Sequence, residues 1–146
     1  MPNIEKEMKA AQHLLYVSMK YTKTCDVMLN LMHRWQQMVD EAMLAVLERA
    51  KKKKVIKEIP VAPIQKVNVV KGLFKKEAVV QDTMTLYLFF RKVHSFEMFK
   101  EHEFRKNVCL RIIDDQGKER IIDIEKLKEW QALLENFIKF VRTHTA

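Results

Sequence analysis

The sequence predicts a mainly α-helical bundle with two long N-terminal helices (or one bent helix), a short connector helix, two further helices and a small β-hairpin near the C-terminus. Two observations favour helices. The chain of 146 residues has only 2 Gly and 3 Pro, and glycine alone usually makes up about 7% of a protein. Apolar residues also recur at helical spacing over most of the chain. The length is that of one domain, so residues 1–146 are treated as a single unit.

Residues 4–53 are predicted to be helical with at most one interruption. Apolar residues at steps of three and four mark one face in each half, namely Ile4, Met8, Ala11 and Leu15, then Met28, Leu31, Trp35, Met38 and Ala42. Between the halves, residues 21–26 are polar and β-branched. They form either a kink or a short loop in which Thr24 or Asp26 caps a second helix. The pattern leaves open whether this segment is one helix or two.

The middle of the chain alternates breakers with apolar segments. Pro60 and Pro63 make residues 59–63 an extended connector, because proline disfavours helical backbone in the residue before it. Pro63 can open a short helix over residues 64–71, with Gly72 after its last turn. Residues 77–93 are the next predicted helix. Its end, residues 86–90, is apolar on nearly every side, which indicates either burial between neighbours or an oligomer interface.

The C-terminal third is predicted to hold an irregular segment, a hairpin and a helix. Residues 95–106 show no regular pattern. Residues 108–113 are rich in β-branched side chains, Asp-Asp-Gln-Gly at 114–117 is typical of a turn, and residues 120–122 resume the apolar pattern. Asp123 is expected to cap a last helix that ends near Arg142.

The net charge of +8 comes from one short segment. Residues 51–80 hold nine basic and two acidic side chains, whereas the rest of the chain is nearly balanced. All nine are lysines: Lys51, Lys52, Lys53, Lys54, Lys57, Lys66, Lys71, Lys75 and Lys76. Such a cluster can attract phosphate backbones. It can equally be the solvated end of a long helix, where lysines complement the helix dipole, and arginine would be the better phosphate ligand.

A second polar stretch supplies the candidate catalytic residues Arg91, His94, His102 and Arg105. Arginine and histidine near aromatic residues suit phosphate contact, or RNA cleavage with histidine as acid or base. The alternative is that these residues surround the end of a buried helix. The sequence has no glycine-rich phosphate loop and no HExxH motif, so we expect no cofactor and no metal.

Localisation follows from what the sequence lacks. Cys25 and Cys109 form no CxxC motif and are expected to be reduced. The N-terminal residues lack the apolar segment of a signal peptide, and no apolar run has the roughly 20 residues of a membrane span. We therefore expect a soluble, cytoplasmic protein with no membrane partner.

The order of these elements resembles small archaeal proteins related to the HEPN domain. The resemblance rests on the long helical pair, the connector, the helix ending Leu-Tyr-Leu-Phe-Phe-Arg-Lys at 86–92, the Glu-Phe-Arg-Lys segment at 103–106, the hairpin and the Phe-rich last helix. HEPN-like proteins are bundles built on two long antiparallel helices, and they usually dimerise. Many are ribonucleases of toxin–antitoxin or defence systems, and others are inactive partners of nucleotidyltransferases.

Active HEPN members carry an arginine followed by a histidine after four to six intervening residues, and no arginine in this chain has a histidine at that distance. The spacing from Arg91 to His94 is too short for this motif, and the spacing from Arg91 to His102 is too long. The resemblance therefore implies a non-catalytic interaction or binding module, homodimeric, with nucleic acid or a nucleotidyltransferase as its candidate partner. The alternative is a divergent, metal-independent ribonuclease.

Overall fold

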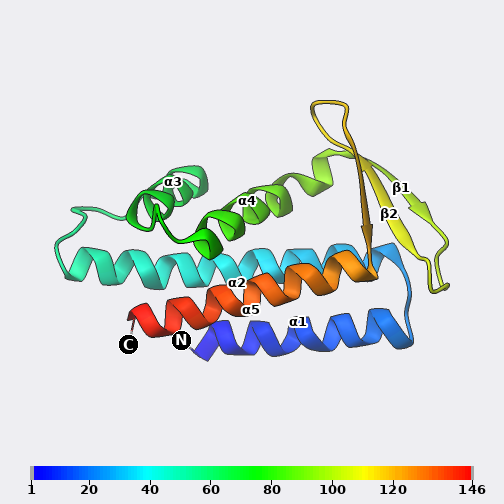
Figure 1. Cartoon of the computed structure of the whole chain (residues 1–146), viewed down its shortest axis with the longest axis horizontal. Coiled ribbons are helices and arrows are strands. Elements are labelled where there is room, and N and C mark those ends of the chain that lie inside the picture. The colour runs from blue at the N-terminus through cyan, green and yellow to red at the C-terminus, as the bar shows by residue number, and fades with distance from the viewer. Residues whose placement is uncertain (1, 146) are drawn as a thin grey trace.

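The computed structural model describes residues 2–145, with side chains from residue 4 onward. It is mainly helical, as predicted, and ends in a three-stranded sheet followed by a long helix (Figure 1). The helices are α1 (Pro2–Lys20), α2 (Cys25–Lys52), α3 (Pro63–Leu73), α4 (Ala78–Lys92) and α5 (Ile124–Thr145). The strands are β1 (Glu97–Glu101), β2 (Cys109–Ile113) and β3 (Glu119–Asp123), and the short 3-10 turn η1 (Val93–Ser95) precedes β1.

The N-terminal segment is two antiparallel helices rather than one (Figure 1). Thr24 takes an extended backbone conformation, and its Oγ1 accepts a hydrogen bond from the Val27 N–H at 3.3 Å. The carboxylate of Glu103, from the distant β1–β2 loop, accepts from the Cys25 N–H at 3.1 Å. Two of the free N–H groups at the start of α2 are thereby satisfied, which fixes the break in the helix. Thr24, and not Asp26, is the cap.

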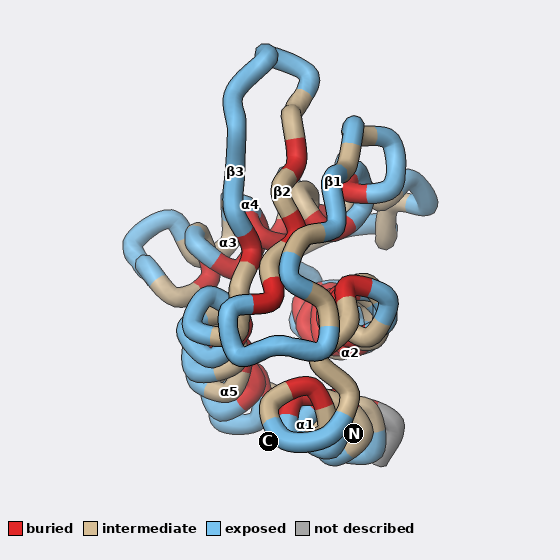
Figure 2. The backbone as a smooth tube through the Cα atoms, turned by 90° about the vertical axis from the view of Figure 1, so that its right-hand side faces the viewer, coloured by how far each residue is buried: buried red, intermediate tan, exposed pale blue. Residues whose placement is uncertain are grey.

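Helix α2 is the centre of the core. It contacts every other helix, and its buried face includes Trp35, which is 1% exposed and stacks on Phe90 of α4 with ring centroids 5.8 Å apart. Figure 2 shows the buried part of the backbone where α2 meets its neighbours, with the outer faces of α1 and α5 exposed. The amphipathic pattern read from the sequence thus corresponds to packing around one helix.

Helix α4 lies against α2 and α5, and this accounts for its apolar end. Leu86, Tyr87 and Phe90 are buried inside the protomer, and Phe89 packs against Trp130 of α5 with centroids 5.7 Å apart. Of the two interpretations of residues 86–90, burial between neighbouring helices is the one that the structure provides. Leu88 and Phe89 remain half-buried.

The predicted hairpin is part of a larger sheet, with strand order β1-β2-β3 and antiparallel pairing throughout. Residues 97–101, within the segment predicted to be irregular, form β1 and pair with β2 from Glu97↔Ile113 to Glu101↔Cys109. That prediction was wrong because β1 has a polar, unalternating sequence, and it owes its conformation to the hydrogen bonds that β2 offers.

One face of the sheet packs on the helices and the other faces solvent. Leu110, Ile112 and Ile122 are at most 1% exposed and form the inner face. On the outer face, the Arg111 guanidinium lies 4.4 Å from the centre of the Phe99 ring. The turn between β2 and β3 projects beyond the helices (Figure 2).

Two helix ends differ from prediction. Helix α3 continues through Gly72 to Leu73, and its last carbonyls are bound by the Gln81 side chain, which donates to the oxygens of Lys71 (3.1 Å) and Phe74 (3.0 Å). The end of α3 is therefore capped by a side chain from α4, whereas the sequence predicts a glycine cap at Gly72. Helix α5 is capped as predicted, since Asp123 Oδ1 accepts from the Lys126 N–H at 2.8 Å, but it runs on to Thr145. Within the described chain, no helix combines the length and apolar character needed to cross a bilayer.

Candidate functional site

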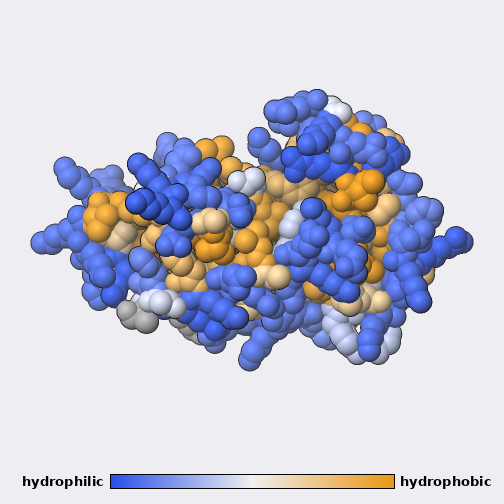
Figure 3. Space-filling view, in the orientation of Figure 1, coloured by the Kyte–Doolittle hydropathy of each residue, from blue (hydrophilic) through white to orange (hydrophobic). Residues whose placement is uncertain are grey.

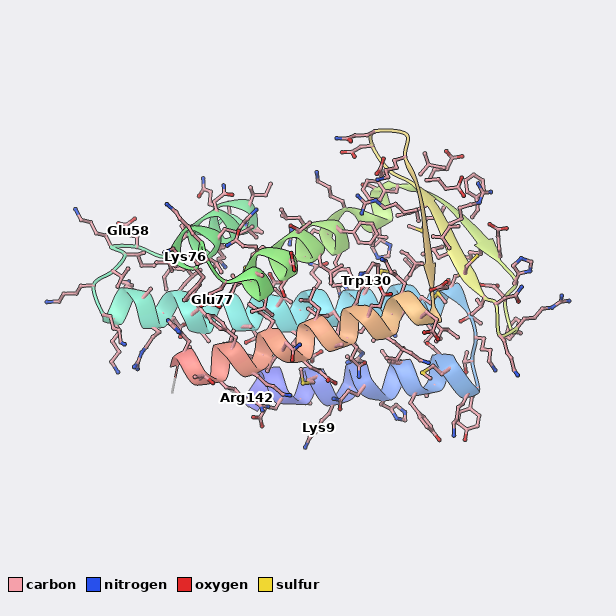
Figure 4. All side chains as sticks on the ribbon, viewed as in Figure 1. Lys9, Glu58, Lys76, Glu77, Trp130 and Arg142 are labelled. Atoms are coloured by element: carbon pink, nitrogen blue, oxygen red, sulfur yellow. The ribbon has the colours of Figure 1, made fainter. Side chains whose placement is uncertain are left out.

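The lysine-rich segment gathers at one end of the molecule. We call this the lysine end: the last turn of α2, the connector, α3 and the turn into α4 (Figure 1). Seven of its nine lysines are exposed, while Lys66 and Lys71 are half-buried. Figure 4 shows Lys76 and Glu58 pointing outward at this end. Among the described residues, none of the nine lysines takes part in an ion pair.

A left-handed turn at Lys54 brings the chain out of α2. The Val55 N–H donates to the Ala50 carbonyl at 2.9 Å, and the Lys54 N–H donates to the Lys51 carbonyl at 3.0 Å. This is the Schellman pattern of helix ends, in which glycine usually takes the left-handed position. Here Lys54 takes it, with a φ of 62°. The turn leaves residues 51–54 exposed around the helix end.

Apolar side chains are exposed among these lysines. Val55 is 62% exposed, Val61 90% and Ile64 59%. In Figure 3, this end of the molecule is mostly hydrophilic, with hydrophobic atoms between the charged ones. A surface that is both basic and apolar suits a partner with negative charge and apolar or aromatic groups.

A pocket of about 290 Å³, which we call the end pocket, opens at the lysine end. It is built where the C-terminal ends of α2, α3 and α5 meet, and no acidic residue lines it. Its lining consists of Val46, Arg49, Ala50, Lys53, Val55, Leu73, Phe74 and His144.

The aromatic part of the end pocket is held by ring contacts. The Phe74 ring meets His144 edge-on, with centroids 4.7 Å apart, and meets Phe140 edge-on at 5.1 Å. His144 in turn stacks on Phe140 at 5.4 Å, with an angle of 13° between the rings. Sequence reasoning missed this cluster, because Phe74 is remote in sequence from Phe140 and His144 and no local motif joins them.

The candidate catalytic residues lie in two separate places. Arg91 ends α4 and His94 lies in η1, whereas His102 and Arg105 follow β1. The five-residue strand between them is about 17 Å long. The structure therefore does not bring the four residues together.

Neighbouring contacts hold the two pairs apart. The ammonium of Lys92, beside Arg91, lies 4.0 Å from Asp115 in the β2–β3 turn. At the other end of β1, the Phe104 N–H donates to the Lys23 carbonyl between α1 and α2, at 2.6 Å. Each pair is thus held at a different end of the sheet.

Arg91 has a structural partner. Its Nη1 lies 3.5 Å from the Tyr87 hydroxyl, which donates a hydrogen bond to the carboxylate of Asp40 on α2. Burial and, next in size, the hydrogen bond to Asp40 together raise the pKa of Tyr87 to about 12. Tyr87 therefore stays neutral and links α4 to α2, which agrees with the interpretation of Arg91 as part of a helix end.

A second cavity, of about 520 Å³, lies at the opposite end of the molecule. Its lysines Lys23, Lys106 and Lys128 are accompanied by Asp123 and Glu125, and Lys128 pairs with Glu125 at 3.3 Å. The cavity therefore has mixed charge, and Asp123 is already used as the cap of α5. It would attract an anionic ligand less strongly than the lysine end.

The two cysteines are free thiols, as predicted. Cys25 is fully buried and its Sγ donates to the Cys109 carbonyl at 3.3 Å. Burial, with a smaller contribution from Glu103, raises the pKa of Cys25 to about 11, and burial also raises the pKa of Cys109. Neither thiol has the lowered pKa of a nucleophile.

Over residues 2–145, no cluster of three His, Cys, Asp or Glu side chains is arranged to hold a metal ion. Comparisons of the chain with protein-family models, with curated proteins and with solved structures found no significant match. The function therefore has to be inferred from the geometry and charge of the chain itself.

Proposed function

We propose that this protein is a non-catalytic binding module of HEPN-like architecture that binds nucleic acid at the lysine end. The observation that carries the proposal is the gathering of nine lysines, without ion-pair partners in the described chain, around the ends of α2 and α3. Phosphate backbones are the ligands that such an uncompensated positive surface attracts most strongly.

The alternative explanation is that the lysines only balance helix dipoles. The partial charge at the helix ends is too small to balance the charge of the lysines. The C-terminal ends of α2, α3 and α5 line the end pocket, and each helix end carries about −0.5 elementary charge. Together they amount to about −1.5. Nine lysines against Glu58 and Glu77 leave a net charge of +7 on residues 51–80. Most of this charge is available to a partner.

The HEPN-like part of the proposal is supported by the architecture. Two long antiparallel helices, α1 and α2, begin the bundle (Figure 1). The homodimer remains a prediction. Sedimentation velocity at micromolar concentration tests it, and a single monomeric species would contradict it.

The salt dependence of binding tests the proposal. The affinity for labelled single-stranded and duplex nucleic acid of mixed sequence is measured across a range of salt concentrations. For phosphate binding, log K falls with log salt by about 0.7 (single strand) to 0.9 (duplex) per phosphate neutralised. Replacing Lys51, Lys52, Lys53 and Lys54 with glutamine should lower the affinity and flatten that slope.

A matched control removes four exposed lysines elsewhere, on α1, on the β2–β3 turn and on α5. These are Lys9, Lys20, Lys118 and Lys126. Both variants lose the same charge, so an equal loss of affinity would mean that only net charge matters and would contradict a site at the lysine end. A flat salt slope in the wild type would exclude phosphate binding altogether.

The ribonuclease alternative has less support, because Arg91 and His94 lie at one end of β1 and His102 and Arg105 at the other. Acid–base catalysis needs its groups within hydrogen-bond reach of one substrate. Incubation with a mixed RNA pool tests it. Cleavage that disappears in a His94→Ala/His102→Ala double variant would revive the alternative.

A further inference from the structure

The end pocket has room for one flat ring system. Its volume is about 290 Å³, and a cavity of roughly 150 Å³ can hold benzene. The lining comes from the ends of three helices, which are rigid elements. The pocket lies within the lysine end, since Lys53 and Val55 form part of its wall.

Aromatic rings form one side of this pocket and contact one another. Phe74 is fixed between Phe140 and His144 by the edge-on contacts at 5.1 and 4.7 Å. Its backbone is also fixed, because its N–H donates to the Val70 carbonyl and its carbonyl accepts from Gln81. Such pre-ordered rings are the platforms on which single-stranded bases stack, whatever the base.

Cationic groups form another side of the pocket. Arg49 and Lys53 are four residues apart on α2 and therefore share a helix face. The Arg49 Nε is buried and has no hydrogen-bond partner. Among the described residues, Arg49 also takes part in no ion pair. The terminal N–H groups of its guanidinium can therefore bind a phosphate oxygen. With no acidic residue in the lining, nothing in the pocket competes for that guanidinium.

We propose that the end pocket takes one unpaired nucleobase of a single strand, stacked on the Phe74 ring with its edge toward His144, whose ring stands at 87° to that of Phe74. The adjoining phosphate is bound by Arg49 and Lys53. This rests on the proposed nucleic-acid binding and specifies its ligand. The lysines attract any phosphate backbone, whereas the pocket requires a base that is not held in a duplex. An acidic peptide could match the charge, but an aromatic ring in the pocket wall favours a base.

The test compares single-stranded RNA with a duplex of the same sequence, using fluorescence anisotropy at one salt concentration. Phe74→Leu keeps an apolar side chain against Phe140 but removes the ring. We expect it to weaken single-strand binding about fivefold or more, the equivalent of one lost base stack, and to leave duplex binding within about twofold. His144→Ala changes an exposed side chain near the end of α5 and should act in the same direction without affecting folding.

The outcomes separate this inference from the proposed function. If glutamines at residues 51–54 weaken both ligands while Phe74→Leu and His144→Ala weaken neither, the lysine end binds nucleic acid and the pocket proposal is overturned. Equal losses for single strand and duplex also overturn it. A labelled peptide of alternating leucine and glutamate is the third ligand. If only the peptide loses affinity in the two pocket variants, the pocket binds acidic peptide instead.

Discussion

Replacing Tyr87 with phenylalanine removes one hydroxyl from the middle of the bundle. Tyr87 is 0% exposed, and its hydroxyl donates to Asp40, so the side chain joins α4 to α2. The rest of the ring is unchanged and keeps its packing. The variant therefore isolates the contribution of this hydrogen bond.

The expected loss is about 1.5 kcal/mol of unfolding free energy. A hydrogen bond to a charged group contributes about 1.5–3 kcal/mol. The lower end applies because Asp40 is only half-buried and lines an open surface pocket, where water can replace the lost hydroxyl. The Arg91 guanidinium, 3.5 Å from the hydroxyl, also loses a weak partner.

The same bond predicts a dependence on alkaline pH. Burial and then the bond to Asp40 raise the pKa of Tyr87 from 10.0 to about 12 in the folded chain. The unfolded chain therefore loses this proton at lower pH than the folded chain. The stabilisation is complete below pH 10 and disappears as the pH rises through about 12.

Urea unfolding of the wild type and the variant, measured at neutral pH and at intervals above pH 10, checks both statements. Tyr16→Phe is the control, because Tyr16 is 47% exposed and its loss of a hydroxyl should change the unfolding free energy little. The difference between wild type and Tyr87→Phe should shrink between pH 10 and 12. A difference below about 0.5 kcal/mol at neutral pH, or one that does not depend on pH, would refute the reasoning.

Three further predictions concern helix ends and thiols. Lys54→Gly should raise the unfolding free energy by about 0.5–1 kcal/mol, because φ at Lys54 is 62° and glycine adopts this left-handed conformation without strain. Lys53→Gly is the control and should lower the unfolding free energy, because φ at Lys53 is −82°. Equal effects of the two substitutions in urea unfolding would argue against the left-handed turn. Asp123→Ala should cost about 1 kcal/mol by removing the cap of α5, and Asp123→Asn should retain most of the stability; a similar loss in both would count against a capping role. Cys25 should resist iodoacetamide in the folded protein, because its pKa is raised to about 11 and it has no exposed surface. It should react after unfolding in guanidinium chloride, and mass spectrometry measures the labelling. Rapid labelling of the folded chain would contradict its burial.

Local sequence was sufficient for the long helices and their caps. The apolar steps in residues 4–53 become the faces that α1 and α2 bury, and Thr24 and Asp123 cap helices as their side-chain chemistry predicts. These features depend on interactions within a few residues, so they can be read from spacing and residue type. The break between α1 and α2 was left open because part of its cause, Glu103, lies far along the chain.

Nonlocal contacts decided what the sequence could not. Strand β1 exists because β2 lies beside it, and the apolar end of α4 packs against α2 and α5. The separation of His94 from His102 follows from the same strand. Each result depends on which elements become neighbours, and that is set by the packing of the whole core.

The sequence by itself determined that the positive charge of this protein belongs to residues 51–80 and that long helices carry most of the fold. Only the tertiary structure decided that the charged segment meets the end of α5, so that Arg49, Phe74 and His144 share one pocket. The physical reason is that charge is a property of each residue, whereas a pocket forms only where the ends of separate helices pack together.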